Sequence, residues 1–135
     1  MRFTNKTVFI TGAAGGIGRQ TGLSFAKEGA NVAVSDLDFD MASRVAKEIK
    51  SVGGNAEPFK LDVTNQNETI ENMKNAYEHF GSLDIAFCNA GIREIVSPLE
   101  LSIEEWRKVI DINVTGVFYN CTNICKALYR KKNKG

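Results

Sequence analysis

The chain has 135 residues, of which 43% are hydrophobic, and its 17 basic and 16 acidic side chains leave a formal net charge of +1. This length suits one small domain with a buried core, and the balanced charge gives no reason to expect a nucleic acid or a membrane surface as a partner. Residues 1–6 carry no apolar signal region and no apolar run approaches the ~18 residues of a membrane span, so we expect a cytoplasmic protein.

Residues 7–18 read Thr-Val-Phe-Ile-Thr-Gly-Ala-Ala-Gly-Gly-Ile-Gly. Residues 6–11 have the composition of a buried strand, and the glycines that follow predict a sharp turn into a helix. Free N–H groups and the helix dipole at such a junction attract a phosphate, and missing Cβ atoms let a pyrophosphate approach the main chain. The stretch therefore predicts a dinucleotide site, although a glycine-rich turn that only reverses the chain would look the same.

The first helix has small residues at Gly18, Gly22 and Ala26, and residues 30–35 form a second predicted strand that ends in Asp36. Asp36 lies 24 residues beyond Gly12, near the ~20-residue offset at which an acidic side chain reaches the ribose hydroxyls of NAD. A carboxylate there accepts hydrogen bonds from the two ribose hydroxyls and repels a 2′-phosphate. We therefore expect NAD to be preferred over NADP. Alternatively, Asp36 simply starts the turn that continues through Leu37.

Two further helices and two further strands follow in alternation. Helical spacing predicts a helix over residues 41–52 and another marked by Ile70, Met73, Tyr77 and Phe80, with Tyr77 at the core or its boundary and His79 on the polar side. Residues 56–61 form a strand that Pro58 favours at a sheet edge, and the apolar residues 83–88 form a strand covered on both faces.

Small or polar residues follow these last two strands. Ala90 and Gly91, after Asn89, would let a ligand approach at the crevice where the strand order reverses. A plain turn is the alternative. Asp62 is followed by Val63. One interpretation of Asp62 is purely local: an acidic side chain near the N-terminus of the next helix, with no ligand contact. The loop 93–101 has apolar residues that could border a substrate or pack inward.

Ser102 and Glu105 form a capping box that begins a long helix. Asn113 lies within its apolar stripe, and an unpaired buried amide costs about 1–3 kcal/mol, so we expect partners for it. Alternatively, the Asn113 amide forms a hydrogen bond to a neighbouring carbonyl group and has no functional role. The stripe comprises Trp106, Val109, Ile110, Val114, Val117, Cys121, Ile124, Cys125 and Leu128.

The three cysteines, Cys88, Cys121 and Cys125, are expected to be buried free thiols in a reducing compartment. Cys121 and Cys125 share a helix face. With one His in the chain and no Cys-x-x-Cys, we expect no metal site.

Residues 11–18 match the Thr-Gly-x-x-x-Gly-x-Gly fingerprint, and with Asp62-Val63, Asn89-Ala90-Gly91 and Asn113 the chain resembles the short-chain dehydrogenase/reductases. The resemblance implies an α/β fold over residues 1–135. It would be an incomplete, doubly wound, Rossmann-type NAD-binding domain, with a parallel sheet of four strands in the order 3-2-1-4 and flanking helices.

The resemblance also implies roles for single residues. Gly15 stands where NADP-preferring relatives often carry Lys or Arg, and Asn113 would bend its helix and hold a water of a proton relay. Asn89 would brace neighbouring strands. The implied cofactor site comprises Gly12, Gly15, Gly16, Ile17 and Gly18 for the pyrophosphate, Asp36 and Leu37 for the adenine ribose, Asp62 and Val63 for adenine, and Asn89, Ala90 and Gly91 for the nicotinamide side.

The chain departs from the family pattern in one respect, because the family's catalytic Ser and Tyr-x-x-x-Lys are missing. Its tyrosines, Tyr77, Tyr119 and Tyr129, are followed four residues on by Gly81, Asn123 and Asn133. A positioned acid typically contributes ~10²–10⁴-fold, so we expect this chain to bind its cofactor without efficient catalysis. We therefore expect a fragment of a longer polypeptide, or a chain completed by a partner.

The expected whole enzyme transfers a hydride between nicotinamide and a secondary alcohol or ketone. The resemblance also implies a homo-oligomer through the helix over residues 102–131. A non-catalytic nucleotide-binding or assembly module is the alternative function, and a purely structural α/β domain is a third.

Overall fold

The computed structural model describes the backbone of residues 1–132 and the side chains of residues 1–128. Four parallel strands form one sheet in the order β3-β2-β1-β4, as the sequence predicts. The elements are β1 (Thr7–Thr11), α1 (Gly16–Lys27), β2 (Asn31–Asp36), α2 (Phe39–Ser51), β3 (Asn55–Lys60), α3 (Gln66–Phe80), β4 (Ile85–Cys88), α4 (Ile103–Ile110), the π-helical η1 (Asp111–Gly116) and α5 (Val117–Lys132).

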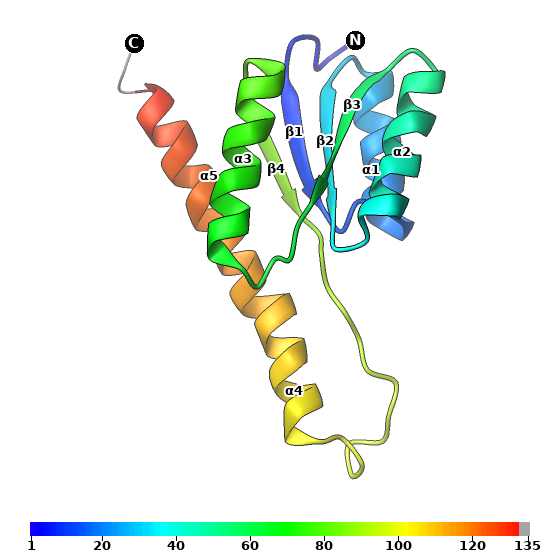
Figure 1. Cartoon of the computed structure of the whole chain (residues 1–135), viewed down its shortest axis with the longest axis vertical. Coiled ribbons are helices and arrows are strands. Elements are labelled where there is room, and N and C mark those ends of the chain that lie inside the picture. The colour runs from blue at the N-terminus through cyan, green and yellow to red at the C-terminus, as the bar shows by residue number, and fades with distance from the viewer. Residues whose placement is uncertain (133–135) are drawn as a thin grey trace.

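Helices cover both faces of the sheet, so its strands are buried from two sides (Figure 1). Val8 and Ile10 of β1 point into one apolar cluster with α1 and α2, whereas Phe9 between them points into a second cluster with α3 and α5. This alternation follows from the two-residue repeat of a strand. It explains why β1 and β2 are nearly continuous apolar runs.

The parallel register brings the carboxyl ends of three strands to one edge of the sheet. Thr11 at the end of β1 is level with Ser35 of β2 and with Cys88 of β4. The segments that leave these strands therefore meet beside one another. Every residue of the predicted cofactor site except Asp62 and Val63 lies at the end of β2, in the segments that follow the three strands or in the first turn of α1.

The long C-terminal helix differs from its prediction in two ways. It is divided into α4, η1 and α5, and Asn113 lies in the π-helical turn. The predicted apolar stripe is only partly confirmed: Ile124 is buried as expected, but Trp106 and Val114 are 52% and 57% exposed. The rest of the buried face consists of Gly116, Asn120 and Asn123. A Cβ at Gly116 would lie 2.8 Å from the Val63 side chain, so the close approach at this glycine decides which face packs inward.

Exposure corrects three further predictions. Tyr77 is 47% exposed because Thr69, Met73 and Ala76 form the buried face of α3. Cys121 and Cys125 are exposed because they lie off the buried face of α5. β4 is only half-buried, since it is the last strand of the sheet and has a neighbour on one side only.

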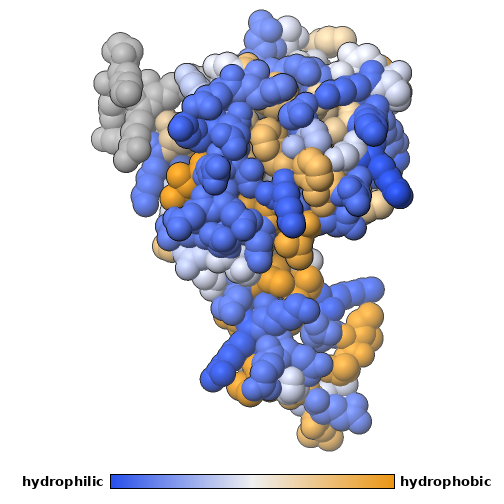
Figure 2. Space-filling view, viewed as in Figure 1, coloured by the Kyte–Doolittle hydropathy of each residue, from blue (hydrophilic) through white to orange (hydrophobic). Residues whose placement is uncertain are grey.

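The loop 89–102 and α4 project beyond the sheet, at the lower end of Figure 1. Hydrophobic surface is visible along one edge and at the tip of this projection, beside hydrophilic side chains (Figure 2). Ile95, Leu99 and Trp106 are 80%, 97% and 52% exposed. Among the described residues, no helix combines the length and the apolar character needed to cross a membrane.

Candidate functional site

The loop between β1 and α1 depends on two glycines for its shape. Gly12 has φ +63°, and a Cβ there would lie 2.8 Å from the Ala90 Cα. A Cβ on Gly18 would overlap the carbonyl oxygen of Gly12 and lie 2.8 Å from Asn89 Nδ2. These two glycines are thus needed for the close packing of the loop against the segment that follows β4.

Gly15 and Gly16 differ from that pair, because a Cβ at either would meet no atom within 4 Å. Gly16 has φ +49°, whereas the extended backbone of Gly15 suits any residue. The outer side of the loop is therefore bare and open, and Ile17 beside it is 73% exposed.

The N-terminus of α1 has neither a side-chain cap nor an acidic residue in its first turn. By contrast, Asp38, Asn65 and Ser102 cap the helices α2, α3 and α4. The first N–H groups of a helix need acceptors from outside it, and together with the dipole they favour an anion. The open loop therefore has the geometry of a phosphate site.

The carboxylate of Asp36 points toward this loop from the end of β2. Its Oδ2 accepts from the Ala14 N–H at 3.0 Å, and its Oδ1 accepts from the Asp38 N–H at 3.1 Å. Asp36 thus starts a turn, as the alternative interpretation held, and it also lies against the glycine loop. Leu37, which follows it, is 63% exposed.

Asp62 and Val63 lie in the turn after β3. The Asp62 Oδ1 accepts hydrogen bonds from the Thr64 N–H at 2.9 Å and from the Thr64 hydroxyl at 2.7 Å. Asp62 therefore holds the turn before α3, whereas the cap of that helix is Asn65. Val63 is 8% exposed and packs on Gly116 at the end of η1. The pair therefore joins the end of β3 to the C-terminal helix.

Asn89 braces the ends of β1 and β4, as the resemblance implied. Its Nδ2 donates to the carbonyl oxygens of Thr11 and Gly12, each at 3.1 Å. The buried Thr11 hydroxyl in turn accepts from the Asn89 and Ala90 N–H groups, each at 3.0 Å. Sequence reasoning missed this role of Thr11, and the only available signal was a hydroxyl at the end of an apolar strand.

Asn113 holds the loop that leaves β4. Its Oδ1 accepts from the Ile92 N–H at 2.8 Å, and its Nδ2 donates to the Ile92 carbonyl at 2.7 Å. A Cβ on Gly91 would lie 3.2 Å from Asn113 Oδ1. The amide thus has partners, and they lie 21 residues away rather than on a neighbouring turn. Asn113 itself is exposed, so the prediction that it is buried on an apolar stripe is wrong.

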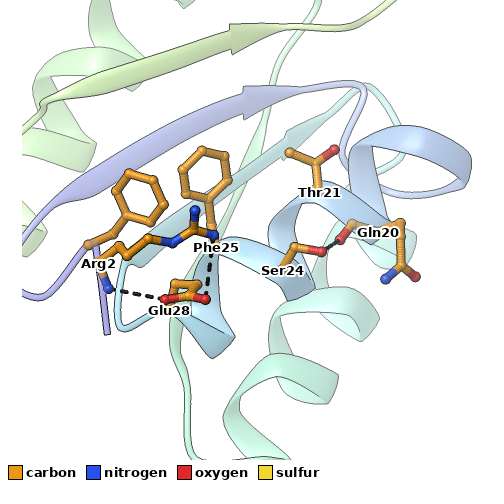
Figure 3. A pocket seen from close by; sticks show the side chains of 7 residues that line it. Arg2, Gln20, Thr21, Ser24, Phe25 and Glu28 are labelled. Carbon is orange, nitrogen blue, oxygen red and sulfur yellow. Dashed lines mark hydrogen bonds and ion pairs between the residues drawn. The ribbon is translucent and has the colours of Figure 1, made fainter.

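Two other polar features lie away from this edge. His79 stacks edge-on against Phe80 and lies 3.9 Å from a Glu57 oxygen, which are surface contacts. A hollow of about 260 Å³ lies between the N-terminal arm and α1, lined by Arg2, Phe3, Gln20, Thr21, Ser24, Phe25 and Glu28 (Figure 3). Arg2 bonds Glu28 there and lowers the pKa of this exposed carboxyl.

A doubly wound parallel sheet with a bare glycine loop at the carboxyl end of its first strand defines a Rossmann-like domain. The family model described as short chain dehydrogenase matches residues 6–135, and the chain belongs to this family. Members of the family bind a nicotinamide cofactor and act as oxidoreductases.

Curated relatives and solved structures agree with this assignment. Cyclohexanol dehydrogenase of Acinetobacter sp. (strain SE19) is 43% identical over 88% of this chain and 48% of its own length. The 3-oxoacyl-[acyl-carrier-protein] reductase FabG of Thermotoga maritima is 32% identical over 98% of this chain and 54% of its own. A short-chain type dehydrogenase/reductase from Mycobacterium marinum superimposes with a TM-score of 0.92 and 37% identity over 96% of this chain and 52% of that one. The chain thus spans about half the length of the relatives it matches.

Proposed function

We propose that the chain is the cofactor-binding half of an NAD-dependent oxidoreductase that transfers a hydride between nicotinamide and a secondary alcohol or ketone. The observation that carries the proposal is the hydrogen bond from the Ala14 N–H to Asp36 Oδ2. It puts an anionic acceptor for a sugar diol beside a loop that is open to a diphosphate. Cyclohexanol dehydrogenase, a relative, takes its name from a secondary alcohol.

The site fits a dinucleotide on three observations: the open space at Gly15 and Gly16, the uncapped start of α1, and the direction of Asp36. The N–H groups of Gly16, Ile17 and Gly18 would hold the pyrophosphate. Asp36 and Leu37 would hold the adenine ribose, Asp62 and Val63 the adenine, and Asn89, Ala90 and Gly91 the nicotinamide side. The bound cofactor would supply or accept the hydride.

A preference for NAD over NADP follows from the charges around Asp36. A carboxylate repels a 2′-phosphate, and Gly15 offers no cation to offset it. Arg19, the cation on the first turns of α1, is engaged in a paired contact with both carboxylate oxygens of Glu48 on α2. These contacts support NAD as the cofactor.

Asn113 would assist catalysis only indirectly, by holding Ile92 and the loop beyond it at the nicotinamide side. We propose that the chain alone binds NAD without efficient turnover, because none of its tyrosines is followed by Lys at the fourth position. The alternative is a non-catalytic nucleotide-binding or assembly module.

Two broader proposals accompany this one. We infer a cytoplasmic location from the three free cysteines. We also infer a homo-oligomer formed through residues 102–131, supported by the exposed apolar side chains of α4, η1 and the start of α5.

The test is calorimetric titration of the chain with NAD and with NADP. Asp36→Asn keeps the side-chain shape and removes the charge. We therefore expect a ~10-fold or greater loss of NAD affinity and a smaller difference between the affinities for NAD and NADP. Asp40→Asn, an exposed acid in the first turn of α2, is the matched control and should leave both affinities unchanged.

Tighter binding of NADP by the unaltered chain, or unchanged NAD affinity in Asp36→Asn, would contradict the cofactor assignment. Dehydrogenase activity on secondary alcohols after fusion to a segment with Tyr-x-x-x-Lys would favour the enzyme over the non-catalytic module. Absence of nucleotide binding would leave only a structural domain.

A further inference from the structure

Two cysteines from distant parts of the chain meet beside the candidate site. The Sγ atoms of Cys88 on β4 and Cys121 on α5 lie 3.7 Å apart, and the two residues are 33 positions apart in sequence. Both are free thiols. A disulfide has an S–S length of about 2.05 Å, so the two sulfur atoms need to approach by less than 2 Å, within the reach of small side-chain rotations.

We propose that Cys88 and Cys121 form an oxidisable dithiol, a modification site at which a hydroperoxide converts the pair into a disulfide that ties β4 to α5. This proposal does not depend on the identity of the cofactor.

The two thiols have different environments. Cys121 is exposed in the single chain, so at low protein concentration, where the chain is not associated through residues 102–131, a small oxidant can reach it from solvent. Cys88 is half-buried, and burial together with the contact to Cys121 raises its pKa to about 12. Cys88 therefore remains a neutral thiol at neutral pH, and Cys121 is the group that reacts first.

The reaction has two steps. The Cys121 sulfur attacks one oxygen of hydrogen peroxide, the O–O bond breaks, and a sulfenic acid and one water form. The Cys88 sulfur then attacks the Cys121 sulfur, the S–O bond breaks, and the hydroxyl leaves with the Cys88 proton as a second water. Two thiols and one peroxide thus give one disulfide and two waters.

The position of Cys88 gives the disulfide a structural consequence. The next residue, Asn89, donates to the Thr11 and Gly12 carbonyls at the start of the glycine loop. A bond from Cys88 to α5 would close a long loop that includes the exposed segment 93–102. It would therefore hold α5 against the sheet and constrain the unfolded chain.

The experiment treats the 135-residue chain with equimolar hydrogen peroxide at low protein concentration, followed by alkylation and peptide mapping. We expect a Cys88–Cys121 linkage with Cys125 still alkylated, and a rise in Tm of about 5–10 °C that a thiol reductant reverses. Cys125→Ser, one helical turn from Cys121, is the matched control and should keep both effects.

Cys88→Ser and Cys121→Ser should each lose the linkage and the rise in Tm. The exposed position of Cys121 keeps the second variant informative if the half-buried Cys88 variant unfolds. Full alkylation of all three cysteines after peroxide treatment, or a linkage that includes Cys125, would overturn the proposal.

Discussion

The glycines of the loop after β1 have two different physical functions. Gly12 and Gly18 allow the backbone to pack against Ala90 and Asn89, whereas Gly15 and Gly16 border open space. The first pair is needed by the fold itself. The second pair leaves the outer side of the loop bare, which is what a bulky anionic ligand requires.

This difference predicts that the same Gly→Ala substitution lowers the stability of the fold at one position and leaves it almost unchanged at the other. Gly18→Ala should destabilise the fold by about 3 kcal/mol and lower Tm by about 10 °C, because its Cβ would overlap the Gly12 carbonyl. Gly15→Ala, with no atom within 4 Å of its Cβ, should leave Tm within about 2 °C. Thermal unfolding followed by circular dichroism measures both, and equal losses would contradict the distinction.

Asn113 also contacts a residue that is far from it in the sequence. Asn113→Ala removes both hydrogen bonds to the Ile92 backbone, and each such bond is worth about 0.5–1.5 kcal/mol. We expect faster amide exchange and faster proteolysis within residues 92–101. Asn75→Ala, an exposed amide on α3, is the control. Unchanged protection of the loop in Asn113→Ala would show that other contacts hold it.

At the scale of elements, α4 is the helix with the weakest support from the core, since none of its residues is buried. Its N-terminus is closed by the reciprocal bonds of the capping box: Glu105 N–H to Ser102 Oγ at 3.2 Å, and Ser102 N–H to Glu105 Oε2 at 2.8 Å. Local sequence alone therefore specifies where α4 begins.

The capping box should make α4 sensitive to acid. The Ser102 N–H and hydroxyl bond the Glu105 carboxylate and lower its pKa, so the ionised form is favoured by the helix. The stabilisation is present above the usual Glu pKa of about 4.3 and is lost as pH falls through the lowered value. Amide exchange of α4 should rise in that range, Glu105→Gln should weaken this dependence, and Glu104→Gln should retain it.

At the scale of the whole molecule, the apolar surface is unevenly distributed. The sheet and its four flanking helices enclose two clusters, while the projection formed by the loop 89–102 and α4 exposes its apolar side chains (Figure 2). Together with the half-buried β4, this leaves one side of the molecule suited to further protein contacts.

The homo-oligomer proposal predicts where association can be blocked. Trp106→Glu and Phe118→Glu, at side chains that are 52% and 62% exposed, should reduce self-association at least ~10-fold because each buries a charge in the contact. Ile70→Glu, at a 48% exposed position on α3, should not. Size-exclusion chromatography with light scattering measures the mass of each variant, and a monomeric unaltered chain would contradict the proposal.

The sequence by itself determined most of the helices and strands and the residues of the glycine loop. These features depend on short-range chemistry: apolar runs, glycines that end helices with positive φ such as Gly29 and Gly81, and caps such as Ser102. A resemblance to a known family supplied the strand order, and the parallel register confirms it.

Only the tertiary structure decided which face of the C-terminal helix is buried, what Thr11 does, and which cysteines meet. The buried face of η1 and α5 was partly mispredicted because hydropathy favoured Val114 and Cys121, whereas the chain packs Gly116 against Val63 and buries Asn120. Ile124 is buried as predicted. The contacts of Thr11 with Asn89, and of Cys88 with Cys121, join residues that are far apart in sequence. A local sequence pattern does not predict such contacts, because the packing of the sheet against its helices brings these residues together.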